Sequence, residues 1–218
     1  MIQHVHQALA QVRLMRRYVI EKQRFKGYSG RARALSGCVA LMASFWLSQR
    51  PGRAGGYALA VWLAVALAGA AINFGAVLFW FLSDTAADRQ ARRLKPAIEV
   101  LPALAAGAVI TAAFWRDGAF DYIVPVWMII FGIANLASRH VLPREIAWIG
   151  LYYMASGTAL LLLYPRAGLS NPWPMGIVFF VGEWLGGLVI FFDRPERPSW
   201  ASFLGFNLAR ERNDPAAK

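Results

Sequence analysis

Residues 98–137, IEVLPALAAGAVITAAFWRDGAFDYIVPVWMIIFGIANLA, contain two long apolar runs separated by a short polar turn. Each run has about twenty residues, which is the length an α-helix needs to cross the hydrocarbon of a bilayer. The break at residues 115–118, WRDG, supplies the polar and flexible residues with which a chain leaving lipid can turn. The stretch therefore predicts a transmembrane helical hairpin.

The same pattern extends along the chain and gives six apolar runs. They cover residues 34–48, 57–82, 97–115, 120–138, 146–164 and 173–192. The composition agrees, because 58% of the residues are hydrophobic and 16% are charged, whereas about a quarter of the residues in a soluble domain are charged. We expect an all-α membrane protein in which residues 31–193 form six transmembrane helices arranged as three hairpins.

The segments at the two ends of the chain differ from this bundle. Residues 1–30 carry one apolar helical stripe, formed by Val5, Ala8, Val12, Met15 and Val19. Arg13, Arg16 and Arg17 point away from this stripe, so the segment is predicted to be a basic amphipathic helix. It could lie on an anionic inner leaflet or dock a protein partner, including a second copy of the chain. Residues 194–218 are predicted to form a cytoplasmic tail.

Positive charge is distributed unevenly between the loops. Of the 23 Lys and Arg residues, 19 lie before the first apolar run at residue 34, in the C-terminal tail and in the loops at 84–96 and 139–145, and four lie in the three other turns. The positive-inside rule then predicts an inner-membrane protein with both termini in the cytoplasm. Membrane orientation explains the formal charge of +11, so we do not predict nucleic-acid binding.

The most informative polar residue is Glu183, near the middle of the last apolar run. No Arg, Lys or His lies in the middle of another run, so we expect this carboxyl group to be neutral, because a lone charge in the bilayer costs several kcal/mol. Three roles are open for it: a hydrogen bond to Asn73, Ser156 or Thr158 that joins helices, a proton or solute site, and a partner-binding face. Asn135 is a further candidate for an interhelical hydrogen bond.

The sequence offers little that could carry catalysis. Asp84 and Asp88 could hold Mg²⁺ against a diphosphate, but such sites need more clustered carboxylates, and an ordinary Asp88–Arg92 helix pair explains them. The three histidines lie outside the apolar runs, and the one cysteine, Cys38, has no second thiol to pair with. We therefore predict no catalytic, cofactor or metal site, and a protein that is not an enzyme.

Four motifs carry a resemblance to a known group of proteins. They are RALSG at 33–37, GAVITAAFW at 107–115, VPVWMIIFG at 124–132 and GEWLGGLVIFF at 182–192. Together they resemble a group of uncharacterised bacterial inner-membrane proteins with six spans and a basic N-terminal helix. The resemblance implies the fold and the compartment for residues 13–193, and it carries no activity.

Two functions remain open at this point. The first is a non-enzymatic sensor, scaffold or regulatory membrane component that acts through its basic cytoplasmic face. The second is a small-solute or proton-coupled transporter that uses Glu183. A water-filled cavity lined by Glu183, Asn73 and Thr158 would favour transport, whereas a closed, dry bundle would favour a partner.

The charge distribution makes a prediction about topology. In a chain whose only cysteine, Cys38, is replaced by serine, a single cysteine at Gly118 or Gly168 should react with an impermeant maleimide added outside the cell. A cysteine at Gln90 or Ala216 should react only after the membrane is opened. External labelling at Gln90 would overturn the six-span threading.

Overall fold

The computed structural model describes residues 27–50, 55–83, 98, 100–164, 169, 171–193 and 199–204. Within these ranges the regular structure is helical throughout and no strand occurs. The predicted amphipathic stripe with Arg13, Arg16 and Arg17 lies outside the described residues, and so does the loop at 84–97. The all-helical fold class is confirmed for the described part of the chain.

Six long helices follow the six predicted apolar runs. They are α2 (Gly30–Ser48), α3 (Gly55–Ser83), α5 (Leu101–Arg116), α6 (Ile123–Ala137), α7 (Ile146–Leu163) and α8 (Trp173–Phe192). Short 3-10 helices flank α6 at η3 (Phe120–Tyr122) and η4 (Ser138–His140), and a short helix, α9 (Trp200–Phe203), follows α8. The hydrophobic runs therefore located the helices well.

Two helix starts differ most from prediction. Helix α2 begins before the apolar run because the hydroxyl of Ser29 accepts a hydrogen bond from the Ala32 N–H at 3.3 Å and caps the helix. Helix α5 begins later than predicted, with Pro102 in its first turn, where a missing N–H has no helical partner to lose. The earlier start of α2 brings Arg31 and Arg33 into the helix.

Four of these helical segments are long and apolar enough to cross a membrane. They are α3, the continuous segment Phe120–Ala137 that includes α6, α7 and α8. Helix α5 is apolar but shorter, and α2, which carries two arginines, does not belong to the four. By length and composition these four helical segments are compatible with a membrane protein, and a count of six spans stays a prediction.

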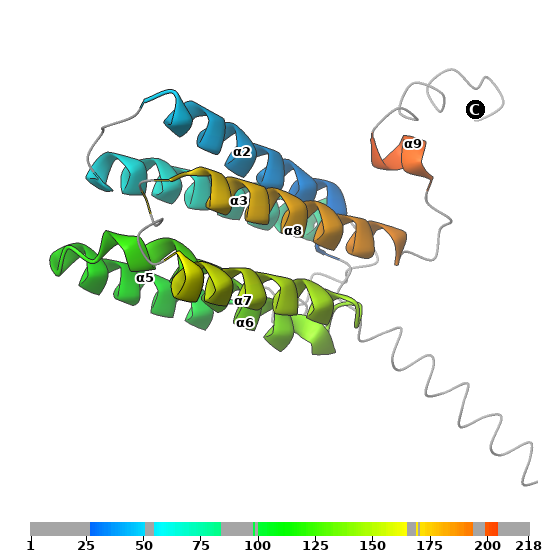
Figure 1. The fold of residues 1–218 in the computed structure, drawn as a ribbon. Helices are drawn as coiled ribbons and strands as arrows, with labels where there is room; N and C mark the ends of the chain where they lie inside the picture. The colour runs from blue at the N-terminus through cyan, green and yellow to red at the C-terminus, as the bar shows by residue number, and fades with distance from the viewer. Residues whose placement is uncertain are drawn as a thin grey trace, which may run out of the picture.

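The long helices form two layers (Figure 1). Helices α2, α3 and α8 make one layer and α5, α6 and α7 make the other, with each long helix running opposite to the one before it. We call the end of the bundle where α2 begins and α8 ends the proximal end, and the opposite end the distal end. Both described ends of the bundle's chain, at α2 and α8, therefore lie at the proximal end.

The three-hairpin arrangement is not confirmed. Neighbouring helices do touch within each predicted hairpin, but the two most extensive contacts are α2 with α8 and α6 with α7. The first and last long helices thus pack against each other, and α6 and α7 belong to different predicted hairpins. The chain closes into a bundle through contacts between segments far apart in sequence.

Small residues let α2 and α8 approach closely. A Cβ atom at Gly187 would lie 2.5 Å from the Gly30 carbonyl oxygen, and one at Gly37 would lie 3.0 Å from the Cβ of Glu183. Near the distal end, the Ser44 hydroxyl donates a hydrogen bond to the Pro172 carbonyl at 2.9 Å. Close backbone approach through small residues is a common way to pack helices in membranes, where lipid is as apolar as the side chains.

The interior differs between the two ends. Toward the distal end, an apolar cluster surrounds Trp62, Ile123 and Met128, all fully buried. A second cluster, built around Ile146, Tyr153 and Ile190, occupies the proximal half. Polar side chains enter the interior beside this second cluster, where α2, α6, α7 and α8 meet.

The α2–α8 contact predicts a contrast between two glycines. Gly187→Ala should destabilise the protein in detergent by about 1–3 kcal/mol, because the added methyl group would collide with the backbone of α2. Gly75→Ala is the control, since a Cβ there has no atom within 4 Å and alanine favours the helix. Thermal unfolding followed by size-exclusion chromatography measures both, and equal stability of the two variants would contradict the observed packing.

Candidate intramembrane polar site

Glu183 lies at the centre of the site. It occupies the middle of α8, which is itself one of the four candidate spans, and only 5% of its surface is exposed. Its Oε1 atom accepts three hydrogen bonds, from two nitrogens of one guanidinium group and from a phenol. A carboxylate buried in a membrane bundle needs such partners, because no water replaces them.

The guanidinium group belongs to Arg33, in the first turn of α2. Its Nε donates to Glu183 Oε1 at 3.1 Å and its Nη2 donates to the same oxygen at 3.0 Å. Arg33 is itself 8% exposed, so both charges of this ion pair are removed from solvent. A guanidinium group stays charged in proteins, so pairing with a carboxylate is what makes its burial tolerable.

Tyr153 on α7 contributes the third hydrogen bond. Its hydroxyl donates to Glu183 Oε1 at 3.0 Å, and the residue is fully buried. The Phe131 ring packs edge to face against the Tyr153 ring, with the ring centres 4.9 Å apart. The centre of the Phe179 ring lies 5.1 Å from that of Tyr153. These aromatic contacts hold the ring in place, so the hydroxyl is directed at the carboxylate.

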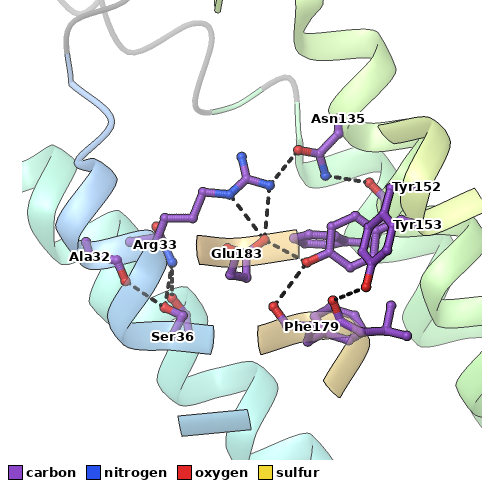
Figure 2. A network of polar contacts seen from close by, with 12 residues as sticks. Ala32, Arg33, Ser36, Asn135, Tyr152, Tyr153, Phe179 and Glu183 are labelled. Atoms are coloured by element: carbon purple, nitrogen blue, oxygen red, sulfur yellow. Dashed lines mark hydrogen bonds and ion pairs between the residues drawn. The ribbon is translucent and has the colours of Figure 1, made fainter. Parts of the chain in front are cut away.

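Asn135 on α6 completes the group. Its Oδ1 accepts a hydrogen bond from Arg33 Nη2 at 2.7 Å, while its Nδ2 donates to the Phe131 carbonyl at 2.8 Å. The second bond fixes the orientation of the amide, so the oxygen faces the guanidinium. Arg33, Asn135, Tyr153 and Glu183, which we call the polar quartet, therefore join four helices from both layers (Figure 2).

Two glycines of α8 make room for the quartet. A Cβ atom at Gly186 would lie 2.7 Å from Arg33 Nε, and one at Gly182 would lie 2.5 Å from the Tyr153 hydroxyl oxygen. Any side chain at these positions would push the guanidinium or the phenol away from Glu183. The GEWLGG sequence thus supplies both the carboxylate and the space for its partners.

The structure brings together only part of the predicted site. Asn135 and Glu183 are both present, joined by Arg33. Asn73 instead donates to Ser36 Oγ and to the Gly69 carbonyl, both at 2.9 Å, and so links α3 to α2 away from the quartet.

The two predicted hydroxyl residues on α7 also lie apart from the quartet. Ser156 is half-buried and Thr158 is exposed, and no hydrogen bond to the quartet is found for either in the described part of the chain. Thr158 faces the outside of the bundle. It lies five residues beyond Tyr153, and side chains five residues apart on an α-helix point to different sides. In the described part of the chain, Asn73 and Thr158 do not lie beside Glu183, so these three residues do not line one cavity.

The expectation that no basic residue would reach Glu183 is wrong. It assumed that only a basic residue in the middle of another run could reach the carboxyl group. Arg33 starts near the proximal end of α2 and reaches inward with its long side chain, which meets Glu183 across 150 positions of sequence. The geometry is that of a buried ion pair with two additional hydrogen-bonding neighbours.

Arg33 and Tyr153 were missed by the sequence reasoning, although α2 contains a signal for Arg33. The buried seam of this helix repeats at intervals of three and four residues, in the order Gly30, Arg33, Gly37, Ala40, Ser44 and Leu47. Such spacing places all six on one face. An arginine on a face otherwise made of small and apolar residues indicates a partner for its charge inside the bundle.

Comparison with known proteins found no match for this chain. No model of a protein family matches the chain, and neither does any curated protein or any solved structure. The resemblance to bacterial six-span proteins therefore stays a prediction. Among the described residues, no group of three or more His, Cys, Asp or Glu side chains could hold a metal ion.

The ion pair predicts a pattern of stabilities in a double-mutant cycle. Glu183→Gln or Arg33→Gln alone should destabilise the bundle by about 3–5 kcal/mol, because each leaves a buried partner without its counterpart. The double variant Arg33→Gln, Glu183→Gln should lose less stability than the sum of the two single losses, because neither residue then leaves a buried charge unpaired. Asn73→Ala is the control, with an expected loss of about 1 kcal/mol for a membrane hydrogen bond outside the quartet.

Unfolding in mixed micelles of a mild detergent and dodecyl sulfate measures these differences. Additive effects of the two single substitutions would mean that Arg33 and Glu183 do not interact.

Proposed function

We propose that this chain is a non-enzymatic membrane component, a sensor, scaffold or regulator that acts through its basic cytoplasmic face. The observation that supports this most is the enclosure of Glu183. The one carboxylate found in the middle of a described candidate span has its charge matched by Arg33 and its surroundings filled by Tyr153 and Asn135. Such a group holds helices together, and it offers no open position to a substrate.

The proposal includes six membrane spans, with α2 and α5 added to the four candidates. The alternating direction of the six long helices supports it, because α2 begins and α3 ends at the proximal end, and α5 begins and α8 ends there as well (Figure 1). The Lys- and Arg-rich segments adjoin these helix ends in the sequence. Arg33 is no obstacle to α2 as a span, since its charge is paired inside the bundle. The proximal end is then cytoplasmic and the membrane is a bacterial inner membrane.

The basic segment at residues 1–30 supplies the contact surface in this proposal. It directly precedes α2 in the sequence, and the first turn of α2 carries Arg33. Arg13, Arg16 and Arg17 would face anionic headgroups or an acidic protein partner. A partner that moves this segment would act on the helix that holds the ion pair.

A second candidate, proton-coupled or small-solute transport, has one observation in its favour. The polar quartet joins α6 and α7 of one layer to α2 and α8 of the other, so its rupture would allow the layers to separate. Transport would then require Glu183 to become accessible to water in another state. The closed arrangement of the described residues favours the regulatory function.

Photo-crosslinking in living cells tests the proposed function. A photoreactive amino acid at Arg17 should yield a discrete adduct with another protein, and the adduct should disappear when Arg13 and Arg16 are replaced by glutamate. The same probe at Arg116, in the distal turn, is the control and should yield none of that adduct. A probe at Arg17 that reacts with lipid alone would contradict a protein partner.

Reconstituted vesicles separate regulation from transport. The wild-type protein and Glu183→Asp should both leave a proton gradient across the vesicle membrane unchanged, because a paired carboxylate in a closed bundle does not exchange protons between the two sides. A pH-sensitive dye inside the vesicles measures the decay. Wild-type proton flux that Glu183→Asp abolishes would favour transport.

A further inference from the structure

The short helix α9 is well defined by its own capping. The hydroxyl of Ser199 accepts from the Ser202 N–H at 3.1 Å, and the hydroxyl of Ser202 accepts from the Ser199 N–H at the same distance. This reciprocal capping box starts a helix even when only one turn follows. The chain therefore forms an ordered turn of helix after α8 has ended.

Phe203 docks this turn against the proximal half of the bundle. It is 5% exposed, and its ring meets those of Phe191 at 5.0 Å and Trp184 at 5.7 Å. Trp184 lies about two helical turns before the end of α8, roughly 12 Å along the helix axis. The Phe203 side chain thus packs against the last part of the candidate span, beside rings of α8.

A second contact comes from α2. The guanidinium of Arg31 donates a hydrogen bond to the Ser202 carbonyl and lies 5.6 Å from the centre of the Phe191 ring. Ala34, one turn further along α2, belongs to the same buried cluster as Phe191 and Phe203. Because the side chain of Ala34 is small, it leaves room for the Phe203 ring beside α2.

Two apolar side chains that flank Phe203 on α9 are exposed. Trp200 and Leu204 are 60% and 55% exposed, and they lie four residues apart on one helical face. The Trp200 ring meets that of Phe192, the last residue of α8, at 4.9 Å. Trp200 and Leu204 therefore continue the outer surface of a candidate membrane span.

We propose that α9 is an interfacial anchor whose Trp200 and Leu204 side chains insert into the lipid bilayer at the proximal boundary between headgroups and acyl chains. The occupant is lipid because the exposed face is continuous with the lipid-facing surface of α8. An indole with an apolar body and one N–H favours this depth. Arg31 beside it has an apolar stem and a charged end that can extend toward the headgroups.

This anchor concerns a surface separate from the polar quartet and does not depend on the proposed regulatory function. It also assigns a role to the first turn of α2. Arg33 points into the bundle, and Arg31, two residues earlier, holds the anchor outside it.

Spin labels can measure the depth of the anchor. In the full-length chain with Cys38→Ser, single labels replace Leu204 or Trp200 in vesicles of phosphatidylethanolamine and phosphatidylglycerol. Two matched labels calibrate the scale: Leu67, 72% exposed in the middle of α3, for lipid, and Asp117, in the distal turn, for water. Collision with oxygen reports lipid, and collision with a nickel chelate reports water.

Both α9 labels should collide with the nickel chelate several-fold less than the Asp117 label, and their ratio of oxygen to nickel collision should lie between those of the Asp117 and Leu67 labels. Leu67, Trp200 and Leu204 are exposed apolar residues, so replacing them leaves the buried core unchanged. Collision with the nickel chelate as strong as at Asp117, at either Leu204 or Trp200, would overturn the proposal.

Discussion

The ion pair between Arg33 and Glu183 is the constraint on which the rest of this bundle depends. Two opposite charges inside a membrane protein must meet, because neither can find water, and their meeting fixes where α2 crosses α8. The glycines at 182 and 186 follow from the same requirement, since they leave space for the phenol and the guanidinium. The close approach of Gly30 and Gly187 brings the two backbones near enough for the arginine to reach.

The pair also explains why the first and last long helices are neighbours. Hairpin contacts between consecutive helices would form in any alternating bundle, whereas the α2–α8 contact joins segments about 150 residues apart. Asn135 and Tyr153 then tie this contact to α6 and α7, so that one polar group holds both layers (Figure 2). Closing the bundle through one buried group makes the arrangement of its helices specific.

The sequence predicted the helices well and the site only in part. Hydrophobic runs located all six long helices, because membrane helices are defined by apolar length and need no knowledge of their neighbours. Asn73 and Thr158 were grouped with Glu183 because all three are polar and lie within runs, but which face of a helix meets which neighbour is a tertiary property. Arg33 was missed because a count of apolar residues starts the span after it, although its spacing from Gly30 and Gly37 puts it on one helical face with small residues.

Solid-state NMR of the protein in bilayers tests the ion pair most directly. With arginine guanidinium nitrogens and glutamate carboxyl carbons labelled, the account predicts a dipolar cross-peak between Arg33 and Glu183, because the nitrogen and oxygen atoms are 3.0 Å apart. This cross-peak should vanish in Arg33→Lys and in Glu183→Gln, while the signals of the other arginines remain. A wild-type spectrum without it, or a cross-peak that survives either substitution, would contradict the account.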